Sequence, residues 1–354
     1  MTLGLCMIVK DEEEVLARCL DSCADAFDEI VVADTGSSDG TKEIAKHYTD
    51  KVFDVPWQND FAAARNAAFS RAESDYLMWL DADDILTPKD RAALCALKAE
   101  LDGTVDAYFL PYDLVEAGCV AMTLWRERIV RRACGFSWAG YVHEAMQVHG
   151  RLSRADVHVT HRRSAKPRTG RNLFLFARAF ADGRMPDVRQ KFYFARELLD
   201  NGLYETAASV YESFLSDEGC AQDRVRACLD LSACRKAAGD REGAKRALFQ
   251  SFSFAPPCSE ACCALGDLHR EAGDYPHAVF YYKLALNEAG ADGFDLPDCR
   301  GFLPWIWLCV CYDRMGDFER ARRCNEKAGE FRPDDPAYLH NKLYFEKRSE
   351  EKKT

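Results

Sequence analysis

The chain has 354 residues, of which 48% are hydrophobic, and carries a formal net charge of -11 at pH 7. This length and apolar content are enough for a sizeable core and favour two domains. The acidic balance argues against general binding to nucleic acid or to anionic membranes, because both require positive charge to displace counterions.

The apolar start Leu3 to Val9 is followed at once by Lys10, Asp11 and three glutamates, and no apolar run in the chain is long enough to span a membrane. We expect neither a membrane span nor a signal peptide, and a cytoplasmic location. The 16 cysteines are scattered and lack the Cys-x-x-Cys spacing of a zinc knuckle. We therefore expect reduced, buried thiols.

Short apolar runs alternate with helical patterns over about the first 115 residues. This alternation predicts an α/β domain with a largely parallel sheet that is covered on both faces. The expected strands and helices are, in chain order, 3–9, 12–23, 30–32, 41–48, 52–55, 61–71 and 76–80. Ligands of such sheets bind beyond the carboxyl ends of the strands, where this chain has polar segments.

The strongest chemical signal is the segment Asp81-Ala82-Asp83-Asp84, directly after an apolar strand. Carboxylates at this spacing repel one another unless a cation lies between them. Mg²⁺ or Mn²⁺ binds one or two carboxylates and leaves its other positions to substrate phosphates, so the segment suits a diphosphate ligand. The alternative is an acidic loop that caps the helix expected near Pro88.

A second polar turn runs from Asp34 to Thr41 and contains Gly36. Asp34 can accept hydrogen bonds from a base or a ribose, and Gly36 lets the backbone approach a ligand. The turn lacks the Gly-Lys-Ser/Thr of a P-loop and is no dinucleotide-binding fingerprint. A plain turn that caps the next helix explains it equally well.

Positive charge is expected on two elements near these turns. Arg65 stands one turn inside a helix whose N-cap is Asp60, so its guanidinium can reach a phosphate or a uracil edge; a surface salt bridge is the alternative. Residues 126–171 contain eleven Lys or Arg against three Asp or Glu, enough to hold a diphosphate leaving group.

Histidines in this basic stretch are further candidates. The pair His143-Glu144 can supply a general base, and His161 can complete a metal shell. Histidines on strands are also often structural, so both interpretations stay open.

From about residue 188 the pattern is helical only, and it repeats. Four glycines interrupt it, at spacings of 37, 34 and 43 residues, and an alanine follows each after five residues: Gly202 and Ala207, Gly239 and Ala244, Gly273 and Ala278, Gly316 and Ala321. A turn glycine and a small residue in the second helix, with a period near 34, are typical of the tetratricopeptide repeat. We expect a loop around 289–304; the alternative is an irregular helical bundle.

Together these motifs resemble the family 2 glycosyltransferases of the GT-A fold. The resemblance rests on four segments in the family's order, 6–12, 34–41, 61–66 and 81–83. The fusion to repeats is similar to the bacteriocin S-glycosyltransferases of the sublancin type. It implies a Rossmann-like GT-A domain at 1–185, an all-α tetratricopeptide-like repeat domain at 186–345 and a charged tail at 346–354.

The resemblance also implies roles for single residues. Asp34 would bind the base, Asp81 the ribose or a metal-bound water, and Asp83 and His161 the Mn²⁺ or Mg²⁺ ion. The expected nucleotide-sugar site consists of Val9, Asp11, Glu12, Asp34, Gly36, Arg65, Asp81, Ala82 and Arg171. Many members of the family have asparagine where this chain has Asp11, which leaves its role open.

The implied reaction is sugar transfer from a nucleotide-diphosphate sugar, with uridine favoured, by one in-line displacement that inverts the anomeric centre. Glu144 is the expected base, with Asp84 and His143 as the other catalytic candidates. The acceptor would be a peptide, a protein or a glycan, and the repeats would bind it or pair two subunits. The alternative is an inactive domain on an interaction scaffold.

Overall fold

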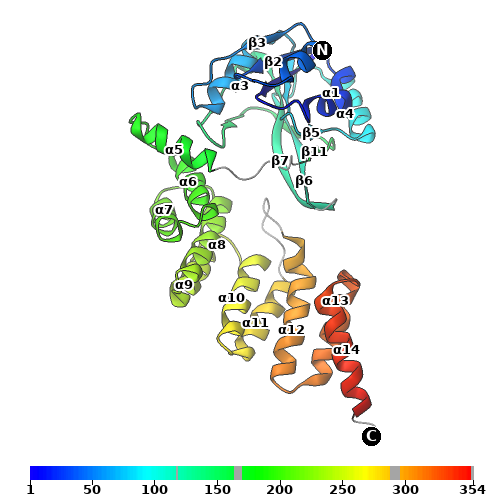
Figure 1. Cartoon of the computed structure of the whole chain (residues 1–354), viewed down its shortest axis with the longest axis vertical. Coiled ribbons are helices and arrows are strands. Elements are labelled where there is room, and N and C mark those ends of the chain that lie inside the picture. Colours follow the sequence, from blue (N-terminus) through cyan, green and yellow to red (C-terminus); the bar gives the residue numbers. More distant parts are fainter. Residues whose placement is uncertain (117–118, 163–169, 288–295, 352–354) are drawn as a thin grey trace. The chain divides into compact units, whose positions relative to one another are not determined.

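The computed structural model describes residues 1–116, 119–162, 170–287 and 296–351. These residues divide into two compact units, Met1–Pro186 and Asp187–Thr354. The first unit is built on a β-sheet with helices, and the second consists of helices (Figure 1). This confirms the predicted fold class of an α/β domain followed by a helical repeat domain.

A nine-stranded sheet forms the centre of the first unit, in the order β3-β2-β1-β4-β7-β6-β11-β5, with β10 beside β6. The strands are β1 Leu3–Val9, β2 Glu29–Asp34, β3 Val52–Asp54, β4 Tyr76–Trp79, β5 Asp84–Ile85, β6 Ala107–Glu116, β7 Cys119–Arg131, β10 Leu152–Arg154 and β11 Val159–His161. Strands β1 to β4 pair in parallel, whereas β7 is antiparallel to both β4 and β6. A separate small ribbon pairs β8 Trp138–Ala139 with β9 Ala145–Met146.

Both faces of this sheet are covered, as predicted. The helices of the first unit are α1 Leu16–Cys23, α2 Thr41–Lys46, α3 Phe61–Phe69, α4 Pro88–Glu100 and α5 Arg171–Ala181. Alternate residues of β1 point to opposite faces because side chains alternate along a strand. Leu5 and Met7 join the cluster that includes α1 and α4, and Cys6 joins the cluster that includes α3.

All seven elements expected in the first 80 residues are present, but α1 is shorter than predicted. It begins at Leu16 rather than Glu12. The backbone N–H of Glu12 donates to Oγ1 of Thr41 (2.7 Å), and that of Glu13 donates to Asp39 (3.2 Å). Residues 10–15 are thus tied to the turn after β2, and this tertiary contact overrides their helical pattern.

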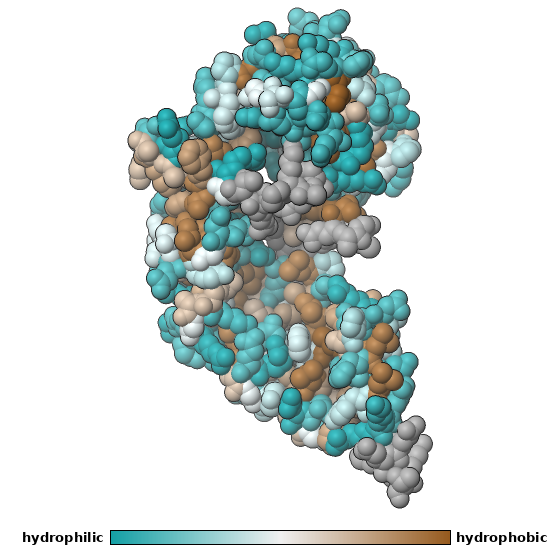
Figure 2. All heavy atoms as spheres, viewed as in Figure 1, coloured by the Kyte–Doolittle hydropathy of each residue, from teal (hydrophilic) through white to brown (hydrophobic). Residues whose placement is uncertain are grey.

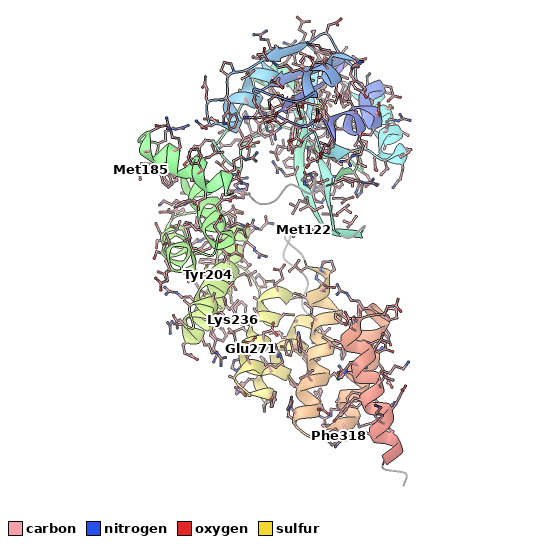
Figure 3. The ribbon with its side chains drawn as sticks, viewed as in Figure 1. Met122, Met185, Tyr204, Lys236, Glu271 and Phe318 are labelled. Atoms are coloured by element: carbon pink, nitrogen blue, oxygen red, sulfur yellow. The ribbon has the colours of Figure 1, made fainter. Side chains whose placement is uncertain are left out.

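The second unit consists of antiparallel helix pairs, which confirms the predicted tetratricopeptide repeats. The helices are α6 Val188–Asp200, α7 Tyr204–Ser216, α8 Ala221–Ala237, α9 Arg241–Ser251, α10 Ser259–Glu271, α11 Tyr275–Asn287, α12 Phe302–Arg314, α13 Phe318–Phe331 and α14 Pro336–Glu351. Adjacent repeats are also joined by side chains: Lys236 of α8 donates to Glu271 of α10 (2.7 Å), and both are labelled in Figure 3.

The turn glycines and packing alanines act as predicted. Gly202, Gly239, Gly273 and Gly316 have φ angles of 76°, 82°, 77° and 81°, which favour glycine at the end of a helix. The four alanines five residues later are fully buried. Each small side chain lets the second helix of its pair approach the first closely.

Three expectations about the helical part of the chain need correction. The segment 289–304 is not all loop, since a 3₁₀ helix spans Pro297–Arg300 and α12 begins at Phe302, which is buried; 288–295 lies outside the described residues. The helical part of the chain also begins before residue 188, since α5 spans Arg171–Ala181 and lies in the first unit. Most of the expected tail 346–354 belongs to α14.

The surface and the thiols are in line with the composition. Hydrophilic side chains predominate on the face of the first unit seen in Figure 2. None of the helices in the described part of the chain is long and apolar enough to cross a membrane. The described cysteines are free thiols and most are buried. Burial raises the pKa of Cys228 and of Cys309 to about 12, so both stay protonated and pack as small apolar side chains.

Candidate active site

In the acidic turn after β4, the side chains of the three aspartates point in different directions. The backbone N–H of Asp84 donates to the carbonyl of Asp81 (3.0 Å), and the N–H of Asp81 donates to Oδ2 of Asp84 (3.0 Å). This closed turn buries Asp84 completely and leaves the side chains of Asp81 and Asp83 partly exposed, at 35% and 22%. Two of the three carboxylates therefore face a ligand that arrives at the carboxyl edge of the sheet.

Asp84 is held from inside the sheet by Arg128 of β7. Nη1 of Arg128 donates to Oδ2 of Asp84 (3.0 Å) and to the carbonyl of Trp79 (3.2 Å), and the hydroxyl of Tyr112 donates to Oδ1 of Asp84 (3.1 Å). The guanidinium lies between the rings of Trp79 (3.7 Å) and Tyr112 (4.3 Å). Removing one partner of a fully buried, hydrogen-bonded ion pair strongly destabilises a protein. The Asp84–Arg128 pair therefore holds the acidic turn in place.

His161 completes a cluster of possible metal ligands. It lies on β11 opposite Asp84 of β5, and its Nδ1 is 3.4 Å from Oδ1 of Asp83 and 3.2 Å from Oδ1 of Asp84. Burial raises the pKa of Asp83 to about 6, with a further rise from the neighbouring aspartates and an opposing effect from His161. Two carboxylates and an imidazole within 4.8 Å of one another suit a divalent cation.

Arg65 of α3 links the acidic turn to the segment between β8 and β9. Its Nη2 donates to Oδ1 of Asp81 (2.7 Å) and its Nε donates to Oε1 of Glu144 (2.6 Å). Trp79 and Trp138 flank the guanidinium at 4.7 and 4.9 Å. Since Arg65 is only 7% exposed, it is no ordinary surface salt bridge.

This network sets the protonation state of Asp81. Burial alone would raise the pKa of Asp81, but Arg65, and next Arg128, lower it to about 2. Burial likewise opposes the charge on Arg65, whose pKa nevertheless rises because Asp81 and Glu144 lie beside it. Asp81 is therefore an anion throughout the neutral pH range, whereas Asp83, two residues away, titrates much closer to neutrality.

Asn66 positions the ribbon that carries Glu144. Its side-chain amide donates to the carbonyl of Trp138 (3.0 Å) and accepts from the N–H of Trp138 (2.8 Å), which aligns β8 with α3. His143 adopts a φ of 53°, a left-handed conformation that is uncommon for a residue other than glycine. The turn thereby carries Glu144 back to Arg65, and Glu144 is mostly buried there.

Asp34, at the end of β2, closes a tight turn with one oxygen. Its Oδ1 accepts from the N–H groups of Gly36 (2.9 Å) and Ser37 (2.8 Å), while its buried Oδ2 has no hydrogen-bond partner in the structure described. Gly36 has a φ of 106°, and nothing lies within 4 Å of the position that a Cβ would occupy. A buried acceptor without a partner costs free energy, so a ligand group that donates a hydrogen bond to Oδ2 would stabilise this turn.

Asp11 joins the loops that follow β1 and β2. Its Oδ1 accepts from the N–H (2.8 Å) and the hydroxyl (3.1 Å) of Ser38, and its own N–H donates to Oγ of Ser37 (3.0 Å). The carbonyl of Val9 accepts from the N–H of Thr35 (2.9 Å). The contacts described for Asp11 and Val9 thus hold the loop around the buried Asp34.

The remaining predicted residues also lie in the first unit, but their surroundings differ. Ala82 is buried in the core. Arg171 begins α5, is exposed, and places its guanidinium 5.1 Å from the ring of Phe61. Arg163, Lys166 and Arg168 of the basic stretch lie outside the described residues.

Arg128 and Tyr112 were not singled out from the sequence, although Arg128 lies within the basic stretch. The available signal was the charged triplet 126–128 inside an otherwise apolar strand. A charged residue on the core side of a strand needs a partner, which here is Asp84.

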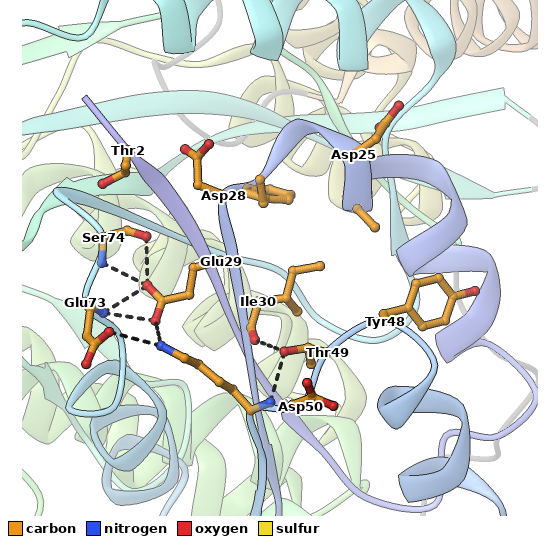
Figure 4. A pocket seen from close by; sticks show the side chains of 13 residues that line it. Thr2, Asp25, Asp28, Glu29, Ile30, Tyr48, Thr49, Asp50, Glu73 and Ser74 are labelled. Carbon is orange, nitrogen blue, oxygen red and sulfur yellow. Dashed lines mark hydrogen bonds and ion pairs between the residues drawn. The ribbon is translucent and has the colours of Figure 1, made fainter.

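A pocket of about 680 Å³ lies at the opposite, amino-terminal edge of β1 and β2 (Figure 4). Glu29 is its central acceptor and binds Nζ of Lys51 (2.7 Å), together with the hydroxyl (2.7 Å) and the N–H (2.8 Å) of Ser74. Burial would raise the pKa of Glu29, but these bonds lower it to about 2. The charge of Glu29 is thus satisfied by groups of the protein itself, so Glu29 does not call for a ligand in this pocket.

The sequence is similar to known proteins over both units. Residues 5–113 match the family model of glycosyl transferase family 2, and residues 259–292 match a tetratricopeptide repeat model. A TPR repeat-containing protein of Synechococcus elongatus is 30% identical over 295 residues, which cover 81% of this chain and 66% of that protein.

Two curated glycosyltransferases are also similar. The SPbeta prophage-derived glycosyltransferase SunS of Bacillus subtilis is 31% identical over 114 residues, which cover 31% of this chain and 27% of SunS. The lipopolysaccharide core biosynthesis glycosyltransferase LpsC of Rhizobium meliloti is 28% identical over 169 residues, which cover 44% of this chain and 60% of LpsC. The chain spans less than two thirds of the length of each of these three relatives.

Proposed function

Because the chain carries a glycosyl transferase family 2 domain followed by tetratricopeptide repeats, we propose that it transfers a sugar from a nucleotide-diphosphate sugar to an acceptor. The observation that carries this proposal is the acidic turn, in which Asp81 and Asp83 face outward beside His161 and Arg65. Such a corner holds a diphosphate only together with a cation, since phosphate and carboxylate repel each other.

Asp83 and His161 are the residues that would hold a Mn²⁺ or Mg²⁺ ion, with Asp84 behind them. The raised pKa of Asp83 supports this assignment, because burial and the neighbouring carboxylates of Asp81 and Asp84 raise it and a bound cation would offset both effects. The ion would neutralise charge on the diphosphate leaving group.

The nucleotide part of the sugar donor would lie over the loops after β1 and β2. The unpartnered Oδ2 of Asp34 supports a hydrogen bond from the base, and the open space at Gly36 supports close approach of the ligand. Uridine is part of the proposal, as is Asp81 at the ribose. Val9, Asp11 and Glu12 would shape this loop, and Arg171 would approach from α5.

Glu144 is the base that we propose for the acceptor, with inversion at the anomeric carbon. Asp84 is completely buried and three donors surround its oxygens, so its carboxylate is not accessible to an acceptor, which supports a positioning role. Arg65 contacts Oε1 of Glu144 and fixes its direction. His143, next to it in the strained turn, is the remaining candidate.

The acceptor is proposed to be a peptide, a protein or a glycan that the repeats bind, with pairing of two chains through the repeats as a further possibility and the cytoplasm as the location. The alternative is a domain without catalysis on an interaction scaffold. The geometry favours the enzyme, because it positions Asp81, Arg65 and Glu144 together.

The test is release of UDP from UDP-sugars in the presence of Mn²⁺, measured for the full chain and for Asp83→Asn. We expect the variant to lose at least about 100-fold in kcat while its circular dichroism is unchanged, because removing an electrostatic contact to a leaving group costs this much. Equal rates of UDP release in both proteins would contradict the metal-assisted mechanism. No UDP release from any UDP-sugar, with or without an acceptor peptide, would favour the scaffold.

A further inference from the structure

A second set of metal-binding side chains lies in the helical unit, at the turn between α10 and α11. Glu271, labelled in Figure 3, is the last residue of α10 beside this turn. His269 precedes the turn, Asp274 follows its glycine, and His277 lies in the first turn of α11. Nδ1 of His269 is 2.9 Å and Nδ1 of His277 is 2.8 Å from the Asp274 carboxylate. One donor atom from each of the three lies within 4.8 Å of the others.

Capping of α11 explains the aspartate but not the two histidines. Asp240 and Asp317 occupy the same position in neighbouring repeats and accept the N–H three residues later, at 2.7 and 3.1 Å. Those repeats do without histidine: where this one has His269 and His277, they have Arg235 and Gly243, and Tyr312 and Arg320. The turn therefore needs only the aspartate, and the paired imidazoles are an addition of this repeat.

The two rings are arranged for a shared ligand. The ring of His269 stacks on that of His277 (5.2 Å, 28°) and on that of Tyr281 (5.4 Å, 22°). The side chain of His269 is 13% exposed and that of His277 is 67% exposed. One imidazole is thus fixed by packing, while the other can rotate around an ion that enters from solvent.

We propose that His269, Asp274 and His277 bind a divalent transition-metal ion of the zinc class, with water in the remaining position. Two imidazole nitrogens and one carboxylate favour Zn²⁺, Co²⁺ or Ni²⁺ over Mg²⁺. Metal–ligand distances of about 2.0–2.2 Å require these side chains to close around the ion, with an unprotonated Nδ1 on each neutral ring. The ion joins α10 to α11 within one repeat, independently of the proposed sugar transfer.

The test is titration of metal-free, full-length protein with ZnCl₂ by isothermal calorimetry, comparing variants with the parent chain. Asp274→Asn removes the charged ligand but retains the cap, because asparagine caps helices as well as aspartate does. We expect this variant and the double variant His269→Ala/His277→Ala to lose one zinc equivalent, or to bind it at least about tenfold more weakly. Zinc bound at the acidic turn or at cysteines cancels in the comparison.

His340→Ala is the matched control, since His340 is an exposed histidine of α14 in the same unit. It should bind as many zinc equivalents as the parent. Circular dichroism of each metal-free variant verifies that the repeats remain folded. Unchanged stoichiometry and affinity in Asp274→Asn, or an equal loss in His340→Ala, would overturn the proposal.

Discussion

Arg65 has a position that depends on contacts with several segments of the chain. Its guanidinium is buried between two tryptophan rings and bridges two carboxylates from different segments. Arginine suits this position because its planar fork donates to both partners at once and stacks on aromatic faces. Lysine offers the same charge as a point and cannot reproduce this geometry.

Replacing Arg65 with lysine should therefore destabilise the protein and lower activity together. We expect a loss of about 3 kcal/mol or more in the free energy of unfolding, because Glu144 would remain mostly buried with incomplete pairing and Asp81 would lose a hydrogen bond. Urea denaturation measures the stability, and UDP release measures the activity. Arg71→Lys is the control, since Arg71 is exposed, and it should change stability by less than about 0.5 kcal/mol. A similar loss in both variants would contradict this account.

Glu29 gives the stability a pH dependence with a definite sign. Its pKa falls from 4.5 to about 2 on folding, because hydrogen bonds from Lys51 and Ser74 outweigh burial. A carboxyl group with a lowered folded-state pKa stabilises the protein above its unfolded pKa, and this contribution is lost as the pH falls through the folded pKa.

The stability difference between the parent and Glu29→Gln should thus be full at neutral pH and should shrink between about pH 4.5 and pH 2. Urea denaturation at several pH values measures this difference. Glu73→Gln is the matched control, because Glu73 also contacts Lys51 but is 86% exposed. A pH-independent difference for Glu29→Gln would show that the bonds around it do not set its pKa.

At the scale of elements, contact distance decides how the repeat helices pair. Gly266 of α10 lies against Tyr282 of α11, and a Cβ at Gly266 would meet the tyrosine ring at 2.6 Å. Tyr282 is fully buried and donates to Asp267 (2.6 Å), so it has no room to move away. The glycine inside the helix is explained by this packing rather than by helix propensity.

We expect Gly266→Ala to destabilise the chain by about 1–3 kcal/mol, although alanine gains about 1 kcal/mol in helix propensity over glycine. Thermal unfolding followed by circular dichroism provides the measurement. Gly266→Ala combined with Tyr282→Phe should recover none of the loss, because the phenylalanine ring occupies the same space. An increase in stability for Gly266→Ala would mean that the two helices can separate at little cost.

At the scale of the whole molecule, each of the two units has hydrophobic clusters of its own. The clusters of the first unit lie on the two faces of the sheet, and those of the second unit lie between repeat helices. A ligand that binds only one folded unit stabilises only that unit.

Scanning calorimetry of the full chain should accordingly show two unfolding transitions. UDP with Mn²⁺ should raise the melting temperature of one transition and leave the other within error, because the residues of the proposed nucleotide site lie in the first unit. Asp83→Asn should reduce this shift without moving the second transition. A single transition that shifts as a whole with ligand would contradict separate unfolding.

Much of the first unit was readable from the chain because local patterns determine it. Short continuous apolar runs defined the strands that precede Asp34 and Asp81, and the position of these acids at strand ends predicted a site at one edge of the sheet. In the second unit, Gly202 and Ala207 with their three counterparts predicted the repeats, since each turn requires a left-handed residue and each helix contact a small one.

The sequence by itself determined the order of the elements, the edge of the sheet that carries the acids, and the repeat period, because these depend on residues close together in the chain. Tertiary structure alone decided that Asp84 is buried on Arg128, that Arg65 joins Asp81 to Glu144, and where α1 begins. Those outcomes depend on pairing between residues tens of positions apart. In such pairs burial and charge compensation, which no local pattern encodes, set the free energy.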